Sequence, residues 1–473
     1  MMLVDLATIV ATSLHGFWMR LSATRQKTQQ NQQSDRDSPL DMDHHPYVDQ
    51  IKSLGTTHET AVRLQTLIQT DGGGSWPPRA VHHAEWPEAL HPYHEVYRAM
   101  SPQLASNVHL TDDRMNLSRC RAFRSQMTAL LQAHINLDAV ENALCDLAQD
   151  DGFSREACNG FFACVAYCRH AFRWATNPIV KVAQDDKVID FPLELDIPWD
   201  YLCRRYGIYS QGGNVMSNLL CDFDTSGRLI YTINEGMSDI VRSSEYHFTY
   251  IFVEMERLAV PIYLHIAQSI DCFERGDKAQ CAEKIRSIFR QLRKVFQAFY
   301  KTFVPSTVSP AVWLSYVQGF HGWAAGTIDG EIYTEYDGVQ GGQMVLIQVI
   351  DAFLGMDPFL STEAFRRHVT YYQRGFIDSV RRHSFRQKAL DAGDGEINIH
   401  MIEIAKLMHV FRSSHRKTAS KYLAVPAPER ITMTAGSSVL QGGSASSNPL
   451  AHVDSLLAAR LRQTRALGKP KDI

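Results

Sequence analysis

The histidine best placed to do chemistry stands in the segment FRSSHRKTASKYL, from Phe411 to Leu423. His415 follows Met408 by two helical turns and precedes Ala419 by about one. This spacing puts it on the apolar stripe of a predicted helix, away from the basic face. A neutral imidazole there is either a hydrogen-bonded core group or a metal ligand, and many haem proteins hold iron through one such histidine. Spacing alone leaves both interpretations open.

A glycine-rich segment is the second feature with chemical potential. It reads DGVQGGQ from Asp337 to Gln343 and comes directly before an apolar stretch with helical character. Gly341 and Gly342 would let backbone N–H groups approach a ligand closely. The segment is neither a G-x-x-x-x-G-K-[ST] phosphate loop nor a G-x-G-x-x-G dinucleotide fingerprint. A plain structural turn is the alternative.

Three further clusters could hold a non-haem metal. They are the pair His82 and His83, the pair His91 and His94, and the set Cys164, Cys168 and His170. The cysteine set lies in an apolar predicted helix, where buried cysteine is the ordinary state, and no second ligand pair follows at zinc spacing. The nine cysteines are scattered and odd in number. This pattern indicates a reducing compartment and predicts a cytoplasmic protein.

The elements that must position these residues have helical periodicity. Apolar residues recur at i, i+3, i+4 and i+7 in residues 282–303 and 362–383. Residues 248–273 are apolar nearly all round, which predicts a central helix, with Pro261 as the expected site of a bend. Residues 119–134 and 154–173 also predict helices. Since no series of alternating strands and no internal repeat is present, the predicted fold class is all-α.

Composition divides the chain into four parts. We expect a disordered or weakly helical extension over 1–45, a smaller N-terminal helical part over 46–200, a helical catalytic core over 201–426, and a mostly disordered tail over 427–473 with a short helix near 453–464. The 48 basic and 51 acidic residues nearly balance, which gives no reason to expect nucleic-acid binding. The apolar stretch 2–19 is short and interrupted by polar residues, so no stable membrane insertion is expected.

Three collinear pieces of the chain resemble the indoleamine 2,3-dioxygenases. The first has R-S-x-H, K-Y and a proline at Arg412, Ser413, His415, Lys421, Tyr422 and Pro426. The second has a G-W pair, D-G-x-x-Y-E-like residues, a terminal G-Q and Q-x-x-D-x-x-L-G at Gly322, Trp323, Asp329, Gly330, Tyr333, Glu335, Gly342, Gln343, Gln348, Asp351, Leu354 and Gly355. The third, LELDIPWDYLCRRYGIYSQGGNVMSN, is similar to the family's segment leading to the distal pocket. The resemblance spans roughly residues 110–426, and the wider superfamily includes tryptophan 2,3-dioxygenase and monodechloroaminopyrrolnitrin synthase.

The resemblance implies an indoleamine 2,3-dioxygenase-like helical bundle around a b-type haem (iron protoporphyrin IX), with His415 as the iron ligand. It also implies a small aromatic substrate and O2 as partners. Beside the haem we expect Arg412, Gly341 and Gly342. As catalytic residues we expect His321, Tyr246 and Tyr250, and as substrate-binding residues Asn214, Val317, Phe320 and Gln340.

Two departures from the family pattern bear on the substrate and the reaction. The arginine that holds the substrate carboxylate in tryptophan-cleaving members corresponds by spacing to Val317, and valine cannot form a charge-assisted pair. The serine before the G-W pair corresponds to His321. Together with Tyr246 and Tyr250, this histidine would make the distal side polar, which favours O–O bond cleavage or peroxide chemistry.

The leading hypothesis is a haem-dependent oxygenase that uses O2 or peroxide on an indole-like or other aromatic metabolite in a biosynthetic pathway. One alternative is a tryptophan 2,3-dioxygenase that forms N-formylkynurenine. Others are a non-catalytic haem-binding or sensing protein and the non-haem metal site described above. A Soret band with rapid oxidation of an aromatic compound would separate the enzyme from the sensor.

Overall fold

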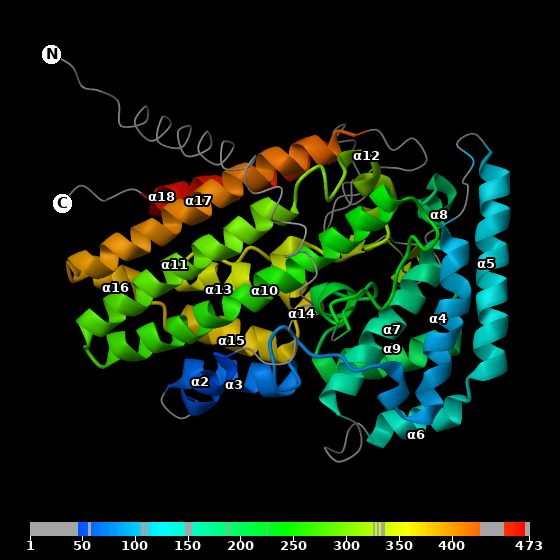
Figure 1. Ribbon diagram of the computed structural model, residues 1–473, viewed down its shortest axis with the longest axis horizontal. Coiled ribbons are helices and arrows are strands. Elements are labelled where there is room, and N and C mark those ends of the chain that lie inside the picture. The colour runs from blue at the N-terminus through cyan, green and yellow to red at the C-terminus, as the bar shows by residue number, and fades with distance from the viewer. Residues whose placement is uncertain are drawn as a thin grey trace, which may run out of the picture. The chain divides into compact units, whose positions relative to one another are not determined.

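The computed structural model of the protein is almost entirely helical, so the predicted all-α fold class is confirmed (Figure 1). The structure describes residues 46–54, 58–105, 109, 112–146, 154–186, 189–224, 226–324, 327–328, 331–332, 336–425 and 449–468. The N-terminal extension, Pro426 and the motif residues Asp329, Gly330, Tyr333 and Glu335 lie outside this range. No helix among the described residues is long and apolar enough to cross a membrane.

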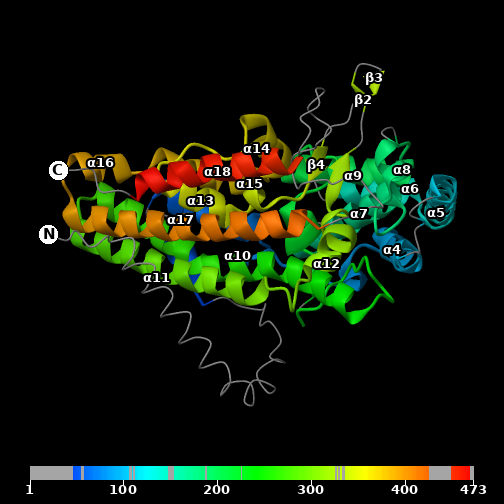
Figure 2. The ribbon, with the colours of Figure 1, turned by 90° about the horizontal axis from the view of Figure 1, so that it is seen from above.

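Three long helices build the part of the fold that matters for function. They are α10 (Asp239–Glu274), α11 (Lys278–Thr302) and α17 (Gly395–Leu423). They lie side by side in both views (Figures 1 and 2), and α10 continues as one helix through Pro261. Asp277 caps α11 by accepting a hydrogen bond from the Gln280 backbone N–H, so the turn after α10 leads directly into the antiparallel helix.

A second group of helices packs against these three. It consists of α2 (Val48–Leu54), α3 (Glu59–Thr70), α13 (Val345–Phe353), α14 (Thr362–His368), α15 (Tyr371–Arg382), α16 (Arg386–Asp391) and α18 (Pro449–Leu467). Helix α18, drawn in red in Figure 2, runs along α17. The tail predicted to be mostly disordered therefore contains a helix longer than expected. Residues 426–448 of that tail lie outside the described range.

The N-terminal helices surround α7, whose residues 157–174 are all buried. These helices are α4 (His91–Leu104), α5 (Asp113–His134), α6 (Leu137–Asp146), α7 (Arg155–Trp174), α8 (Lys181–Asp185) and α9 (Leu193–Tyr206). Ser154 caps α7 at its start, and Ala175 ends it in a left-handed conformation. Residues 43–224 and 228–473 form one compact unit.

One predicted helix is two helices in the structure. The apolar period of residues 362–383 predicted a single helix, but α14 ends at His368 and α15 begins at Tyr371. Thr370 is the cause, because its hydroxyl caps α15 at Gln373 and donates a hydrogen bond to the buried Asp71 carboxylate at 2.5 Å. A tertiary contact therefore overrides the local period.

Short elements connect α11 to α13 and carry much of the functional site. Their bounds are α12 (Pro310–Trp313), the π-helical turn η4 (Leu314–Gln318), β1 (Gly322–Ala324), β2 (Thr327–Ile328), β3 (Glu331–Ile332), β4 (Tyr336–Gly338) and the 3₁₀ turn η5 (Gly341–Gln343). β1 pairs with β4, and β2 pairs with β3, both antiparallel. The remaining short elements are η1 (His83–Glu85), η2 (Glu88–Leu90) and the π-helical turn η3 (Met216–Leu220).

Candidate functional site

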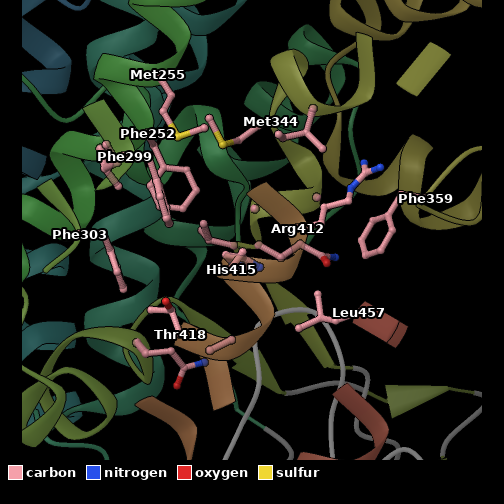
Figure 3. Close-up of a pocket in the computed structure, with 18 of the residues that line it drawn as sticks. Phe252, Met255, Phe299, Phe303, Met344, Phe359, Arg412, His415, Thr418 and Leu457 are labelled. Carbon is pink, nitrogen blue, oxygen red and sulfur yellow. The ribbon is translucent and has the colours of Figure 1, made fainter. Parts of the chain in front are cut away.

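A cavity of about 490 Å³ lies among α10, α11, α17, α18 and residues 339–344 (Figure 3). Most of its lining is aromatic or aliphatic. The apolar lining residues include Phe248, Ile251, Phe252, Met255, Phe299, Phe303, Val339, Met344, Ile347, Phe359, Leu360, Phe411, Leu423, Leu456 and Leu457. None of the described lining residues is an aspartate or a glutamate. Such walls suit a large, flat, mainly apolar molecule.

His415 reaches the cavity from α17, on the stripe that the sequence predicted. Met408 and Phe411 continue this stripe and are buried. The His415 ring stands beside the rings of Phe411 and Phe299, with centroids 6.1 and 6.3 Å away. Burial, together with the neighbouring Arg412 guanidinium, lowers the pKa of His415. The imidazole is therefore neutral near pH 7, which is the form that ligates metals.

A second histidine, His321, lines the same cavity and is fully buried. Neither of its ring nitrogens has a hydrogen-bond partner among the described residues. Burial, with a smaller contribution from His170, lowers the pKa of His321 to about 3. Buried polar atoms are nearly always paired in folded proteins. Two unpaired nitrogens in a cavity wall therefore indicate a partner that the described residues do not supply.

Backbone contacts of the β1–β4 ribbon hold His321 in place. The His321 carbonyl accepts a hydrogen bond from the Val339 N–H at 3.1 Å. Gly338 has φ +103°, and a Cβ at this position would lie 2.5 Å from the same carbonyl oxygen. The close approach and the positive φ both require glycine. Gln343 fastens the loop that follows, since its side chain accepts from the Val215 N–H at 3.0 Å and donates to the Gly338 carbonyl at 2.7 Å.

The glycine-rich segment lies at the cavity, as predicted, but its two glycines differ. Gln340, Gly341 and Gly342 all line the cavity. A Cβ on Gly342 would come within 2.6 Å of the Phe359 ring, whereas a Cβ on Gly341 would meet nothing within 4 Å. The space beside Gly341 is therefore open, whereas the Phe359 ring closes the space beside Gly342. Only Gly342 is required by space.

A buried charge cluster forms another part of the wall. Asp351 of α13 accepts two hydrogen bonds from Arg412, at 2.6 and 2.7 Å, and one from Arg460 of α18 at 2.5 Å. Both arginines line the cavity. Figure 3 shows the Arg412 side chain directed toward Phe359, on the side of the cavity across from Phe299 and Phe303. Arg412 thus lines the cavity, and a single nitrogen of its guanidinium, Nη2, donates to both oxygens of the Asp351 carboxylate.

Two predicted catalytic residues lie elsewhere. Tyr246 and Tyr250 do not line the cavity, because the cavity-facing residues of α10 are Phe248, Ile251, Phe252 and Met255. Positions two residues from 248 and 252 are rotated by about 200° around a helix. The two tyrosines stack on each other, with centroids 5.7 Å apart, beside Phe223. Their expected place on the distal side was therefore wrong.

Three predicted substrate-binding residues are also absent from the cavity wall. Val317 is buried within the π-helical turn η4, and Phe320 packs beside Tyr167 with centroids 6.2 Å apart. Asn214 is a structural residue, since its side chain donates to the His368 carbonyl at 2.7 Å. None of the three side chains lines the described cavity, so this cavity gives their expected substrate-binding role no support.

Sequence reasoning also missed residues that do line the cavity. Trp313 and Gln318 face it from the segment where Val317 was expected to do so. A π turn adds one residue per turn and so changes which positions share a face. Phe359 and Arg460 were missed because they reach the cavity from segments with no local signal for it. The only hint was the weak apolar period near 453–464.

One histidine–carboxylate cluster outside the cavity has the spacing of a metal site. Ligand atoms of His58, Glu274 and His383 lie within 4.8 Å of one another, the only such group among the described residues. The His58 Nδ1 atom accepts a hydrogen bond from the Thr60 N–H at 3.0 Å. Its Nε2 atom must then carry the proton, and it lies 3.2 Å from Glu274. His383 contacts Glu274 at 2.7 Å and Glu59 at 3.2 Å, so the cluster is an ion-pair network.

The metal clusters suggested by the sequence do not assemble. In the cysteine set, the two ring nitrogens of His170 lie 2.6 Å from the carbonyl oxygens of Phe320 and Gly212. Both nitrogens therefore face carbonyl oxygens and are not available to a metal. The rings of His83 and His94 stack face to face, with centroids 3.7 Å apart. In two parallel stacked rings the nitrogen lone pairs lie in separate parallel planes, so they do not converge on one ion.

A comparison with protein families connects this geometry to the resemblance seen in the sequence. Residues 238–455 match the family model described as indoleamine 2,3-dioxygenase. The match, which covers a little under half of the chain, supports the predicted relationship to the indoleamine and tryptophan 2,3-dioxygenase superfamily. The matched range holds His321, His415 and Arg412, but not Leu456, Leu457 or Arg460. A search of curated proteins finds no match.

The residues at the cavity fit a haem. His415 offers a neutral imidazole, and the aromatic and aliphatic walls suit the faces and edges of a porphyrin. The two ring nitrogens of His321, which have no partner among the described residues, could bond to a polar group inside the cavity. Arg412 and Arg460 offer hydrogen-bond donors to carboxylates. A b-type haem carries two carboxylates, its propionates.

Proposed function

We propose that the protein is a haem-dependent oxygenase that adds O2 to an indole-like or other aromatic substrate without a free carboxylate. The observation that carries the proposal is the neutral His415 imidazole, which faces an apolar cavity shared with the unpaired His321. The family match over 238–455 supports the same class.

In this proposal His415 holds the haem iron through a ring nitrogen, and the haem supplies the iron at which O2 is activated. The aromatic side chains of Phe248, Phe252 and Trp313 line the space left for an aromatic substrate. Apolar walls of this kind exclude water from the reacting centre. The polar groups that can orient a substrate are then few, chiefly His321, Gln318 and Gln340.

Charge at the cavity supports a substrate without a free carboxylate. The sequence contains no lysine or arginine between Lys301 and Arg366. This span includes η4, His321 and the glycine-rich segment 337–343. The arginines that line the described cavity are Arg412 and Arg460, and both bind Asp351. Two arginines against one aspartate leave one excess positive charge. The two carboxylates of a haem would pair with this charge, so none is left for a substrate carboxylate.

The protonation of His321 supports O2 addition over peroxide cleavage. Its pKa of about 3 makes the ring a weak proton acceptor, although its N–H can still donate a hydrogen bond to an oxygen atom in the cavity. The argument for peroxide chemistry needed Tyr246 and Tyr250 on the distal side, and they do not line the cavity. A site without a proton-transfer group suits a reaction in which both oxygen atoms enter the substrate.

The experiment is oxygen uptake by the haem-loaded, dithionite-reduced protein with L-tryptophan, tryptamine, indole and 3-methylindole in air-saturated buffer. We expect the uncharged indoles to be oxidised fastest and mass spectrometry to find two added oxygen atoms. L-tryptophan as the fastest substrate, yielding N-formylkynurenine, would contradict the proposed substrate class. Firm haem binding without oxidation of any aromatic compound would instead support the sensing protein.

A further inference from the structure

The charge cluster around Asp351 joins three helices at the cavity wall. Asp351 belongs to α13, Arg412 to α17 and Arg460 to α18. The three side chains are only 3%, 11% and 8% exposed. Arg412 also donates to the Thr464 hydroxyl at 2.5 Å, so two residues of α18 take part. The cluster is thus a buried junction and not a surface ion pair.

The charges in this junction do not balance. Two guanidinium groups face one carboxylate, which leaves one positive charge in a poorly solvated wall. The other contacts of Arg460 are with neutral groups, since it also donates to the backbone carbonyl of Asp357 at 2.8 Å and to the amide oxygen of Gln463 at 2.9 Å. A buried charge without a counter-ion is unfavourable, and an anion beside it would relieve this cost.

The excess charge faces the cavity. Arg412 and Arg460 both line it, and no described lining residue is acidic. The Nε atom of Arg460 is buried and has no hydrogen-bond partner among the described residues. Arg412 stands one turn before His415 on the same helix, so an anion at this junction lies near whatever His415 holds.

We infer that Arg460 and Arg412 together bind a carboxylate of the cavity's occupant, so that α18 supplies part of the binding site. The inference rests on the proposed function and identifies the carboxylate as a haem propionate, because the junction adjoins the haem-ligating face of α17. A carboxylate on the substrate has the same chemistry and is the second source to test. Arg460 lies beyond the range of the family match, so this contact extends the site past the part shared with that family.

The test uses the full-length ferric protein loaded with haem or with haem dimethyl ester, whose propionates cannot carry charge. Haem transfer to excess apomyoglobin is followed by absorbance. We expect Arg460→Gln to speed the transfer of native haem by about tenfold to a hundredfold, as the loss of a charge-assisted hydrogen bond implies. Transfer of the dimethyl ester should not change, and Arg460→Lys should restore part of the native rate.

Arg416→Gln is the matched control. Arg416 forms a bidentate pair with Asp454, at 2.6 Å for both bonds, between the same two helices but away from the cavity. If Arg416→Gln or the dimethyl ester shows the same acceleration, Arg460 acts only by holding α18 in place and the inference is overturned.

If haem transfer is unchanged but KM rises only for substrates that carry a carboxylate, the carboxylate belongs to the substrate. No change in either measurement overturns the inference. A wild-type protein that takes up no haem overturns the proposed function itself.

Discussion

Two histidines 151 residues apart in the chain, His170 and His321, are both fully buried, yet their surroundings are opposite. His170 on α7 lies among packed helices, and each of its ring nitrogens contacts a backbone carbonyl at 2.6 Å. His321 lines the cavity, and neither of its nitrogens has a partner among the described residues. The region around α7 is built for stability, whereas the cavity keeps polar groups unpaired for a ligand.

The sharpest way to break this comparison is His170→Ala. The substitution would leave the carbonyls of Phe320 and Gly212 buried without their donor. We expect the free energy of unfolding to fall by about 3–5 kcal/mol, since each unpaired buried group costs about 1–3 kcal/mol. Urea unfolding of the haem-free protein, followed by circular dichroism, measures it. A loss of less than 1 kcal/mol would mean that the α7 region does not depend on this bridge.

Asp71, whose backbone carbonyl accepts a hydrogen bond from Asn159 of α7, is a buried group that is not fully satisfied. Its Oδ2 atom accepts from Thr370, but its Oδ1 atom is buried without a partner among the described residues. Burial raises the pKa of Asp71 from 3.8 to about 6, against smaller opposing effects of Thr370, Arg155 and Arg374. Between these two pH values the unfolded chain loses the proton while the folded chain keeps it. Stability therefore falls as pH rises from about 4 to 6 and then levels off.

Asp71→Asn tests this pH dependence. The variant should gain up to about 3 kcal/mol relative to the wild-type protein at pH 7 and little at pH 4, because a shift of about two units is worth that much. Unfolding free energies at pH 4, 5, 6 and 7 give the curve. A gain that is equal at all four values would show that Asp71 carries no raised pKa.

On the cavity side, the two glycines of the loop provide a matched pair. Gly342→Val should collide with the Phe359 ring and push it into the cavity, and we expect kcat/KM to fall about tenfold or more while haem content is kept. Gly341→Ala should leave kcat/KM within about twofold, because a Cβ there meets nothing. Steady-state oxygen uptake measures both. Equal effects would mean that the loop acts through backbone flexibility and not through space.

The smallest expected change in stability is that of His321→Leu. Removing two unpaired buried nitrogens leaves no donor or acceptor stranded, so unfolding of the haem-free protein should change by less than about 1 kcal/mol in either direction. The contrast with His170→Ala, under the same conditions, is the test of the comparison. A loss as large as that of His170→Ala would show that His321 has a structural partner.

Periodicity predicted correctly what depends on local sequence. His415 is on the apolar stripe of α17, and the helices around 282–303, 119–134 and 154–173 are present. The break at Thr370 depends on Asp71, which is 299 residues away in the chain. Arg460 meets Asp351 across 109 residues. No local pattern contains such contacts, so the sequence could not predict them.

Several of the expected site residues lie at the cavity, and the roles given to them stay predictions. Arg412, His415 and Gly342 belong to quoted motifs and line the cavity. Tyr246 lies two positions before the cavity-lining Phe248 on α10, and a shift of two positions turns a helical side chain to the other face. Val317 failed through the π turn of η4, which changes the helical register within a single turn.

The central claim is that His415 holds the haem iron, and the absorption spectrum of His415→Gly tests it most directly. Glycine removes the imidazole and leaves a space at the cavity wall. The purified variant should lack the Soret band of the wild-type protein at equal haem supply, while its circular dichroism stays helical. Added imidazole should restore haem binding and the spectrum of a nitrogen-ligated iron. A variant that purifies with full haem and an unchanged Soret band, without imidazole, would contradict the account.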